Sequence, residues 1–377
     1  MTTIEASGSP HLAHRDGAAR DGGTLVLSGW SAVSAYGVGR DVLREGLLSG
    51  RAARVEEAGD GAPVPCVVVP GFRAADHLGR KGTRTMSRST AFAATAIDVL
   101  LRELGPEVAG DPQRIGLVLG VGQGNVQTVM DFTRGALTAS KPYHVDALRF
   151  PDTFLNRAAG QSAIWHGLQG PNTTIAAGRL SALLAIGYAA RLSRGGHCRR
   201  LLVGATEECS PARALLADAV SAGRDLPAPL GEGCVVALLE PAAEAAAAGR
   251  VPVATVAATH FRAAADPAVE GGAELAVCVR AALAKAGAGA DRIRLVVPLG
   301  EYAQQEEAGI RAVLGDADPR WLHCRPLLGD AFAASAGLQL SAALSAAAHW
   351  SKPGDLALLT GIDRDGTVGC ALFGRPD

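Results

Sequence analysis

The chain has 377 residues, enough to bury a large core, with 36 basic and 37 acidic residues and a formal net charge of −1. Because the two charge types are mixed along the chain, no surface for nucleic acid or for an anionic membrane is predicted. No apolar run reaches the roughly 18 uninterrupted residues of a membrane-spanning helix, so we expect a soluble protein that does not enter a membrane.

The cysteines and histidines indicate no metal site and no cofactor. Neither residue type shows the spacing of a zinc or redox motif. The cysteines lie mostly in apolar runs, where a reduced thiol packs as a small hydrophobic group, and this predicts a cytoplasmic location. They are Cys66, Cys198, Cys209, Cys234, Cys278, Cys324 and Cys370.

In chain order, residues 1–23 have the composition of a disordered tail. Short apolar runs bounded by glycine then predict buried strands at 24–29, 114–120, 172–178, 200–204, 233–240, 251–258 and 292–297. Apolar residues at three- and four-residue spacing predict helices at 89–104, 181–194, 274–286, 306–314 and 336–348. This alternation predicts an α/β protein with largely parallel sheets.

The alanine-rich stretch at residues 241–249 lies between two predicted strands and suggests a surface connection. We place the midpoint of a duplicated architecture there. The predicted halves are residues 24–249 and 250–377, packed as one compact unit.

The glycine-rich segment Gly120-Val-Gly-Gln-Gly124 follows a predicted strand. A dinucleotide-binding loop requires a third glycine, here at position 125, and an acidic residue about 20 positions on. The chain has Asn125, and its next acidic residue is Asp131. The segment is therefore interpreted as a tight turn.

The most informative segment is residues 159–187, which contains Ala159-Gly-Gln-Ser-Ala-Ile-Trp-His-Gly-Leu-Gln-Gly-Pro171 and is followed by Leu202-Val-Gly-Ala-Thr-Glu-Glu208. It resembles the nucleophile region of β-ketoacyl synthases, where a strand is followed by T-A-C-x-S-G at the start of a helix. An ungapped alignment puts the family's nucleophilic cysteine at Arg179. The opening Val26-Leu-Ser-Gly-Trp-Ser-Ala-Val-Ser-Ala-Tyr-Gly37 is also similar, and the resemblance extends to Pro376 in the family's order.

The resemblance implies a thiolase-like duplicated fold, layered α-β-α-β-α, but the condensing residues are lost. The family's H-G-T-x-T loop is replaced by Val296-Val-Pro-Leu-Gly-Glu-Tyr302. Its K-x-x-x-G-H motif aligns with Arg325-Pro-Leu-Leu-Gly-Asp330, and its G-F-G-G loop with Gly361-Ile-Asp-Arg. Loss of the nucleophile and both imidazoles leaves no arrangement for a Claisen condensation. We expect no independent condensing activity.

If the fold is retained, Arg179 places a guanidinium at the positive end of a helix inside an apolar pocket. That position requires a carboxylate partner. We predict an ion pair with Asp330, with Glu207 or Glu301 as the next candidates, so that Arg179, Asp330 and Arg325 fill the vacated pocket. The alternative is that Arg179 lies on a solvated turn.

The resemblance to this family also implies a role. Free-standing polyketide systems, of type II, pair an active ketosynthase with a cysteine-less homologue, the chain-length factor, and elongate a chain carried by an acyl carrier protein. This resemblance implies a heterodimer with a ketosynthase and contact with the acyl carrier protein. Arg179 replaces the glutamine usual in aromatic systems and the chain is short, so it is more similar to the factors of polyene-forming systems.

In that pairing, the segment after Gly124 lies at the subunit interface beside the partner's acyl tunnel. The residues expected to set chain length are Gln127, Thr128, Val129 and Phe132, with Met130 and Phe150 as second choices. The strand at 172–177 is expected to run against its counterpart across the dimer axis. The alternative for each of these side chains is plain core or interface packing.

Two other functions fit the same sequence. The chain could be an acyltransferase or malonyl decarboxylase that uses Ser181, two residues beyond the lost cysteine, or another nucleophile. It could also be a homodimeric protein that holds acyl chains without reaction. A covalent adduct or CO2 release by the isolated chain distinguishes the first from a silent subunit.

Overall fold

The computed structural model describes residues 23–57, 64–105, 108, 111–221 and 228–376. The predicted disordered tail therefore falls almost entirely outside the described residues. The strands are β1 (Leu25–Ser34), β2 (Gly37–Val38), β3 (Glu56–Glu57), β4 (Pro65–Val67), β5 (Ile115–Val121), β6 (Asn172–Ile175), β7 (Arg200–Glu207), β8 (Leu230–Gly231), β9 (Gly233–Pro241), β10 (Ala254–Ala263), β11 (Ile293–Val297), β12 (Arg320–Trp321), β13 (Leu356–Ile362) and β14 (Thr367–Gly374).

The helices comprise long elements that cover the sheets and short elements in the connections. The α-helices are α1 (Arg40–Ser49), α2 (Ala74–Leu78), α3 (Arg88–Leu104), α5 (Val126–Thr138), α6 (Arg157–His166), α7 (Ser181–Arg194), α8 (Pro211–Ser221), α9 (Ala242–Ala247), α10 (Pro267–Ala286), α11 (Ala303–Leu314), α12 (Arg325–Leu328) and α13 (Ser335–Ser345). The 3-10 turns are η1 (Pro112–Arg114), η2 (Ala147–Thr153), η3 (Gly178–Leu180), η4 (Ala290–Arg292), η5 (Phe332–Ala334) and η6 (Ala347–Trp350).

The strand order repeats, which confirms the predicted duplication of the fold. The first five main strands lie in the order β1-β9-β7-β5-β6, and the second five in the order β10-β14-β13-β11-β12. In the first set, β1 and β9 are antiparallel, as are β9 and β7, whereas β5 is parallel to both β7 and β6. In the second set, β10 and β14 are antiparallel, as are β14 and β13, whereas β11 is parallel to both β13 and β12. The prediction of largely parallel sheets is thus wrong, because each half contains two antiparallel pairs beside its two parallel pairs.

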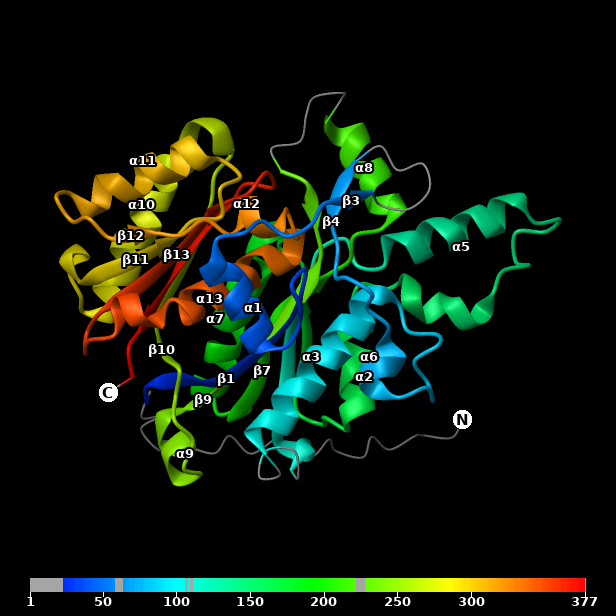
Figure 1. Cartoon of the computed structure of the whole chain (residues 1–377), viewed down its shortest axis with the longest axis horizontal. Helices are drawn as coiled ribbons and strands as arrows, with labels where there is room; N and C mark the ends of the chain where they lie inside the picture. The colour runs from blue at the N-terminus through cyan, green and yellow to red at the C-terminus, as the bar shows by residue number, and fades with distance from the viewer. Residues whose placement is uncertain (1–22, 58–63, 106–107, 109–110, 222–227, 377) are drawn as a thin grey trace, which may run out of the picture.

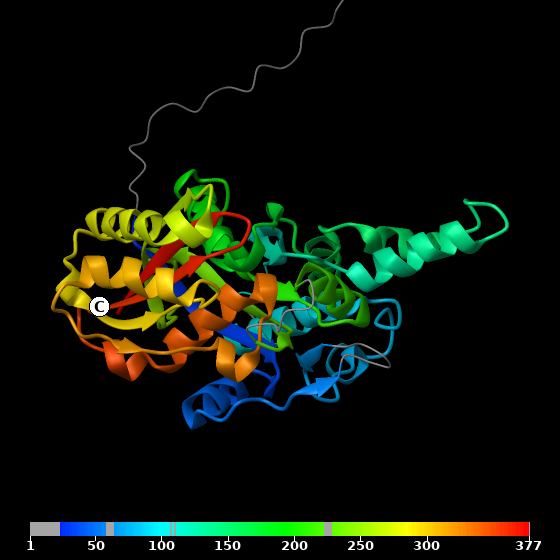
Figure 2. The same cartoon turned by 90° about the horizontal axis from the view of Figure 1, so that it is seen from above.

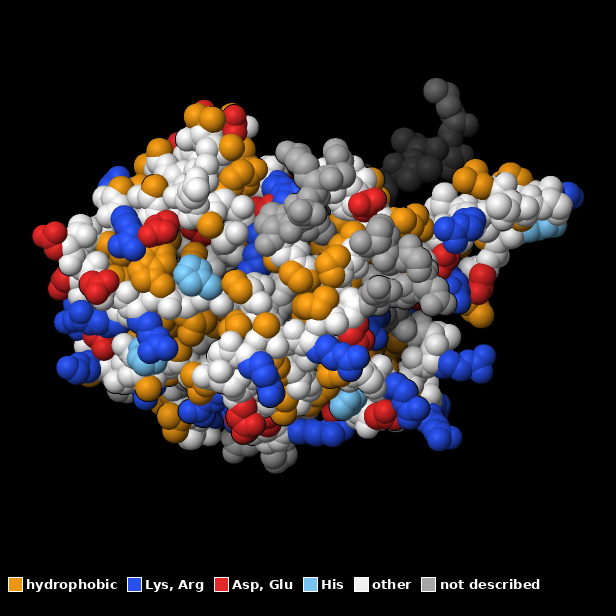
Figure 3. Space-filling view, turned by 45° about the horizontal axis from the view of Figure 1, so that its top comes forward, with side chains coloured by type: hydrophobic (Ala, Val, Ile, Leu, Met, Phe, Trp, Pro, Cys, Tyr) orange, Lys and Arg blue, Asp and Glu red, His pale blue; other side chains and the backbone are white. Residues whose placement is uncertain are grey.

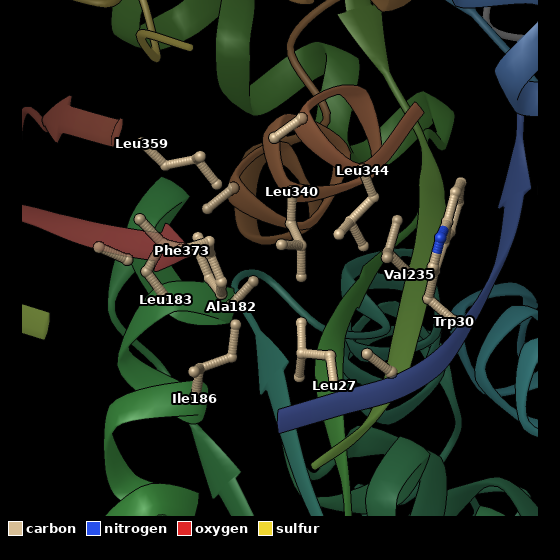
Figure 4. Packing of buried hydrophobic residues seen from close by; sticks show 14 of the residues in the cluster. Leu27, Trp30, Ala182, Leu183, Ile186, Val235, Leu340, Leu344, Leu359 and Phe373 are labelled. Atoms are coloured by element: carbon tan, nitrogen blue, oxygen red, sulfur yellow. The ribbon is translucent and has the colours of Figure 1, made fainter. Parts of the chain in front are cut away.

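The five layers lie side by side across the molecule (Figure 1). The antiparallel pair β1 and β10 joins the two sets of strands into one continuous sheet, whose two parts are called here the first and the second sheet. Helices α3 and α6 cover the outer face of the first sheet, and α10 and α11 cover the outer face of the second. Helices α7 and α13 lie between the two sheets, where their apolar residues meet side chains from β1, β9, β13 and β14 (Figure 4). The layering predicted from the sequence is therefore confirmed.

The central layer is buried because both of its helices are apolar on nearly every face. Ala182, Leu183 and Ile186 of α7 and Leu340 of α13 are at most 3% exposed. Burial on this scale contributes about 1.5–3 kcal/mol for each large side chain. It fixes the N-terminus of α7 deep in the protein, which positions the site described below.

Most predicted elements are present with shifted ends, and several were not predicted. Helix α7 has the predicted bounds. Helix α10 begins seven residues earlier than predicted, where Asp266 accepts a hydrogen bond from Ala268 N at 3.0 Å and Pro267 opens the helix. The strands β13 and β14 and the helices α1, α5, α6 and α8 were not predicted. The division at residues 249 and 250 stays a prediction.

One part of the chain projects from the layered body. Helix α5 and the segment that returns through η2 form an arm that extends far to one side (Figures 1 and 2). None of the residues in α5 is buried. Within the described residues, no helix has the length and apolar character needed to cross a bilayer.

Candidate functional site

Arg179 lies in η3, directly before the first turn of α7. Its side chain is buried, with only 7% of the residue exposed. The preceding Gly178 has φ 52°, in the left-handed region, and this turns the chain into the helix. The alternative of a solvated turn is therefore wrong.

The predicted ion pair between Arg179 and Asp330 is present. The Nη2 atom of Arg179 lies 2.6 Å from Oδ2 of Asp330, and its Nε lies 3.1 Å from both carboxylate oxygens. Glu301 is a more distant neighbour, with Oε2 3.7 Å from Arg179 Nε. Glu207, the other predicted partner, is not among the contacts of Arg179 within the described residues.

Asp363 is a partner of Arg179 that the sequence analysis missed. Its Oδ1 lies 2.7 Å from Nη1 of Arg179, and its Oδ2 accepts a hydrogen bond of 2.5 Å from the backbone N–H of the same residue. The altered loop Gly361-Ile-Asp-Arg was noted in the sequence. Its aspartate could have been proposed as a second anion, but no spacing rule placed it against Arg179.

The same carboxylate explains Gly178. A Cβ atom built at this position would clash directly with Oδ2 of Asp363, so a side chain there is incompatible with the Asp363 contact. Backbone N–H groups at the start of a helix are where anions are ordinarily bound. In this chain the N–H of Arg179 is already occupied by a carboxylate of the protein.

Arg325 and Arg364 extend the cluster. Arg325 Nη1 lies 2.6 Å from Glu301 Oε2, and its Nη2 lies 3.2 Å from Asp330 Oδ2. Arg364 also pairs with Glu301. Three arginines thus face three carboxylates, so the cluster as a whole is close to neutral, as a buried group of charges needs to be.

The two central charges hold each other in the ionised form. Burial alone would raise the pKa of Asp330, but the guanidinium of Arg179 outweighs it and holds that pKa well below its usual range. Burial likewise opposes the charge of Arg179, and Asp330 raises the pKa of the arginine above its ordinary value. Neither group is available as a general acid or base near neutral pH.

Phe332 closes one side of the cluster. Its ring centroid lies 5.0 Å from Cζ of Arg179, within the range of a cation–π contact. It has φ 44°, and within the described residues no other non-glycine residue has a positive φ. A Cβ atom at Gly122 would collide with this ring. The glycine predicted to make a tight turn is thus required for close packing against Phe332.

A cavity of about 430 Å³ adjoins the charged cluster. One wall is charged and includes Arg179, Asp330 and Arg325, together with Arg213. The opposite wall is apolar and comes from α8 and β8, through Leu216, Ala217, Val220 and Leu230. The predicted pocket residues are therefore gathered around one cavity.

Arg213 also lines this cavity. In the described part of the chain, its guanidinium forms no ion pair with a carboxylate side chain. It donates to the backbone oxygens of Glu208, Gly231 and Asp330 at 2.9, 2.5 and 2.7 Å. The sequence analysis gave it no role. Its contacts tie α8 to the Asp330 loop and so hold the apolar wall against the charged one.

Glu207 is fully buried beside the cavity, at the end of β7. Its Oε2 accepts hydrogen bonds of 3.1 Å from the backbone N–H groups of Gly122 and Gln123, and its Oε1 has no partner within the described residues. Burial raises the pKa of Glu207 to about 7. Burial also raises the pKa of the adjacent Glu208 to about 7.

The raised pKa of Glu207 predicts how the free energy of unfolding depends on pH. The folded pKa of Glu207 lies above the unfolded value of about 4.3, so its contribution is full below pH 4 and is lost as the pH rises through 7. We expect Glu207→Gln to raise the free energy of unfolding at pH 8 by on the order of 3 kcal/mol, with little effect at pH 4. Denaturant titrations across this range measure it. The exposed Glu307→Gln serves as the control and should show no such dependence.

Ser181 is held as a structural residue. Its Oγ donates to the backbone oxygen of Gly178 at 2.7 Å and accepts from Ala177 N at 3.0 Å, and the side chain is fully buried. A hydroxyl that makes two hydrogen bonds to the backbone before the helix is not oriented toward a reacting group. It is also absent from the residues that line the 430 Å³ cavity.

The predicted chain-length residues lie on α5, away from this cavity. Gln127 is tied to the start of α8, because its Oε1 accepts from Ala212 N at 2.9 Å. Val129 is 37% exposed. The Phe132 ring lies 5.9 Å from that of Phe150. Thr128 and Met130 are half-buried. None of these residues lines the 430 Å³ cavity, so the structure does not bring the two predicted sets together.

No cluster of His, Cys, Asp and Glu side chains within the described residues is arranged to hold a metal ion. The seven cysteines are all buried and unpaired by disulfides.

Comparisons with known proteins agree with this geometry. The model of the family "Beta-ketoacyl synthase, N-terminal domain" matches residues 67–245. A 3-oxoacyl-[acyl-carrier-protein] synthase 2 of Vibrio cholerae is 28% identical over 281 residues, which is 66% of each chain, and that of Rhizobium meliloti is 30% identical over 48% of this chain. The chain spans 66% and 46% of the lengths of these two curated relatives.

Solved structures match over a greater length. "The ishigamide ketosynthase/chain length factor" is 38% identical, with a TM-score of 0.85, over 94% of this chain and 100% of that one. A second structure, of a type II acyl-carrier protein in complex with its ketosynthase, has a TM-score of 0.79 at 19% identity, again over 94% and 100%, and shows the shared fold. Given 38% identity along the whole of a solved ketosynthase/chain length factor chain, this protein belongs to the β-ketoacyl synthase family.

Proposed function

We propose that this chain is a catalytically silent chain-length factor that pairs with an active ketosynthase and bounds the acyl tunnel during polyketide elongation. The observation that carries the proposal is the state of the α7 N-terminus. Arg179 replaces the family's nucleophile, and the carboxylate of Asp363 occupies the backbone N–H beside it. A site without a thiolate, and with its helix terminus blocked, neither accepts an acyl group nor stabilises an oxyanion.

Two features of the surface support pairing with another subunit. Strand β6 ends the sheet, and within the described residues it pairs only with β5, so its other edge is free to extend the sheet. The arm of α5 and η2 carries exposed apolar side chains (Figure 3). These are Val129, Leu137, Leu148, Phe150, Phe154 and Leu155. Exposed apolar surface on this scale is typical of a protein–protein interface.

The solved relative described as a ketosynthase/chain length factor makes a ketosynthase the natural partner. The relative in complex with an acyl-carrier protein suggests that a carrier protein delivers the growing chain to the pair. A cytoplasmic location stays the prediction made from the sequence.

Reconstitution tests this function. The purified chain, incubated with acyl- or malonyl-loaded carrier protein, is expected to form no covalent adduct and to release no CO2. Addition of the ketosynthase encoded with it should restore elongation. An adduct or CO2 from the chain alone would favour the acyltransferase or decarboxylase alternative, although the buried, doubly hydrogen-bonded Ser181 gives that alternative no support.

The product of the reconstituted pair tests the chain-length residues. We expect Phe132→Ala to lengthen the product by removing a ring at the interface, and Val129→Trp to shorten it by filling space. Mass spectrometry of the released products measures both effects. Thr133→Ala, a substitution at an exposed position on the same helix, is the control and should leave product length unchanged. Unchanged lengths for the first two variants would show that these side chains only pack.

A further inference from the structure

A second hollow lies on the other flank of α7, away from the Arg179 cluster. It has a volume of about 660 Å³ and lies between one face of α7 and the partly exposed face of β10. Leu184, Gly187, Arg191 and Arg194 line the helix side at three- and four-residue spacing. Ala257 and Thr259, both half-buried, line the strand side. We call this hollow the α7–β10 groove.

The groove is lined by cations and by no carboxylate. The cations Arg191, Arg194 and Lys285 face it, together with the imidazole of His260. Among the described residues, neither of these two arginines nor Lys285 forms an ion pair with a carboxylate. Arg191 lies over the ring of Tyr188, with Cζ 5.3 Å from its centroid. In a chain with a net charge of −1, this is a local concentration of positive charge.

Lys285 is held beside the groove by two hydrogen bonds to β10. Lys285 Nζ lies 3.0 Å from Nδ1 of His260 and 3.2 Å from the backbone oxygen of Thr259. Burial lowers the pKa of His260, and the charges of Lys285 and Arg262 lower it further. Arg262 itself is paired with Glu274. The field at the groove therefore favours an anion.

Helix stability accounts for only part of this pattern. Basic residues in the last turn of a helix interact favourably with its dipole, which explains Arg191 and Arg194. Lys285 lies in the last turn of α10, so the dipole of that helix favours it in the same way. The dipoles do not explain why the cations of two different helices line the same groove. The dipole also does not explain why the face of β10 beside α7 is left partly uncovered.

The position of the groove links it to the face proposed for pairing. Helix α7 packs against β6, the free edge strand, and also against β10, which forms the groove. The two features therefore flank one helix. A subunit that extends the sheet at β6 and covers α7 would reach both.

We propose that the α7–β10 groove receives an acidic segment of the ketosynthase partner, an inference that rests on the function proposed above. Carboxylates on that segment pair with Arg191, Arg194 and Lys285. An acidic segment would neutralise the three cations, whereas a basic segment would be repelled by them.

Charge reversal tests the proposal. The variant Arg191→Glu, Arg194→Glu, Lys285→Glu is mixed with the ketosynthase encoded with this chain, and the dissociation constant is measured at low and high salt. We expect an increase of about tenfold or more at low salt and a weaker salt dependence than in the wild type. The matched control reverses three exposed arginines outside the groove, Arg44, Arg84 and Arg320, and should bind as the wild type does.

The possible outcomes separate this inference from the proposed function. If the wild-type chain does not bind the ketosynthase, the proposed function fails. If the wild type binds and the groove variant binds equally well with the same salt dependence, only the groove inference fails. If the variant pairs normally but the complex loses affinity for the acyl carrier protein, the groove serves the carrier and our inference is wrong. Circular dichroism and the unfolding midpoint of the variant establish that it is folded.

Discussion

Replacement of Arg179 by methionine is expected to lower the free energy of unfolding by about 3–5 kcal/mol. Methionine fills most of the volume, so the loss comes from electrostatics. Asp330 and Asp363, each at most 5% exposed, would keep their negative charges without the guanidinium that now lies 2.6 and 2.7 Å away. The shift in the denaturant midpoint at constant slope measures the effect.

A surface ion pair of the same length provides the control. Arg73 and Asp76 are also separated by 2.7 Å, but their side chains are 74% and 49% exposed. Arg73→Met should leave the free energy of unfolding nearly unchanged, because water and salt screen an exposed pair. Equal effects of the two substitutions would contradict the view that the Arg179 cluster is a buried, mutually dependent unit.

Lowering the pH should remove part of the stabilisation that the ion pair between Arg179 and Asp330 provides. The pKa of Asp330 is held below its unfolded value by Arg179, so its contribution is present above about pH 4 and is lost as the pH falls further. In Arg179→Met this dependence should weaken, because only the more distant Arg325, at 3.2 Å, still pairs with Asp330. The acid limb is opposite in sign to that of Glu207, whose contribution is lost as the pH rises.

Restoring the family's cysteine should not restore a nucleophile. We expect Arg179→Cys to form no acyl thioester with an acyl-loaded carrier protein, and to react at least about tenfold more slowly with iodoacetamide than a free thiol. Reactivity depends on the thiolate, and three carboxylates around position 179 would raise the pKa of a thiol placed there. Asp363 would also still occupy the backbone N–H that favours an anion at the helix terminus.

The double variant Arg179→Cys, Asp363→Gly separates these causes. It frees the backbone N–H of residue 179 and removes one negative charge, so its thiol should react faster than that of the single variant. Intact-protein mass spectrometry follows both. An acyl adduct on the single variant would show that the altered loops do not block the site and would weaken the proposal of a silent subunit.

Much of the charged cluster could be predicted from the sequence, because its central residues are identified by local sequence pattern and by alignment with the family. Arg179 was placed at the head of a helix by the glycine-bounded strand before it and the apolar periodicity after it. A buried arginine requires a carboxylate, and Asp330 occupies the family position that faces the nucleophile. Both expectations hold in the structure.

Other parts of the site depended on long-range geometry. Asp363 comes from the loop after β13 and meets Arg179 only because the second half of the fold packs against α7. Glu301, predicted only as an alternative partner, comes from the loop after β11. Strand direction was likewise mispredicted, since buried parallel and buried antiparallel strands are both apolar throughout and differ only in their pairing.

By itself, the sequence determined the family resemblance and the need for an anion near Arg179, with Asp330 as the first candidate. The duplicated layered fold and the lost nucleophile are what that resemblance implies. Only the tertiary structure decided the geometry of these contacts, that Asp363 joins them and binds the backbone N–H at the helix terminus, and that cations from α7 and α10 line one groove. The physical reason is that electrostatic contacts between distant segments depend on positions to within an ångström or two, which side-chain periodicity does not encode.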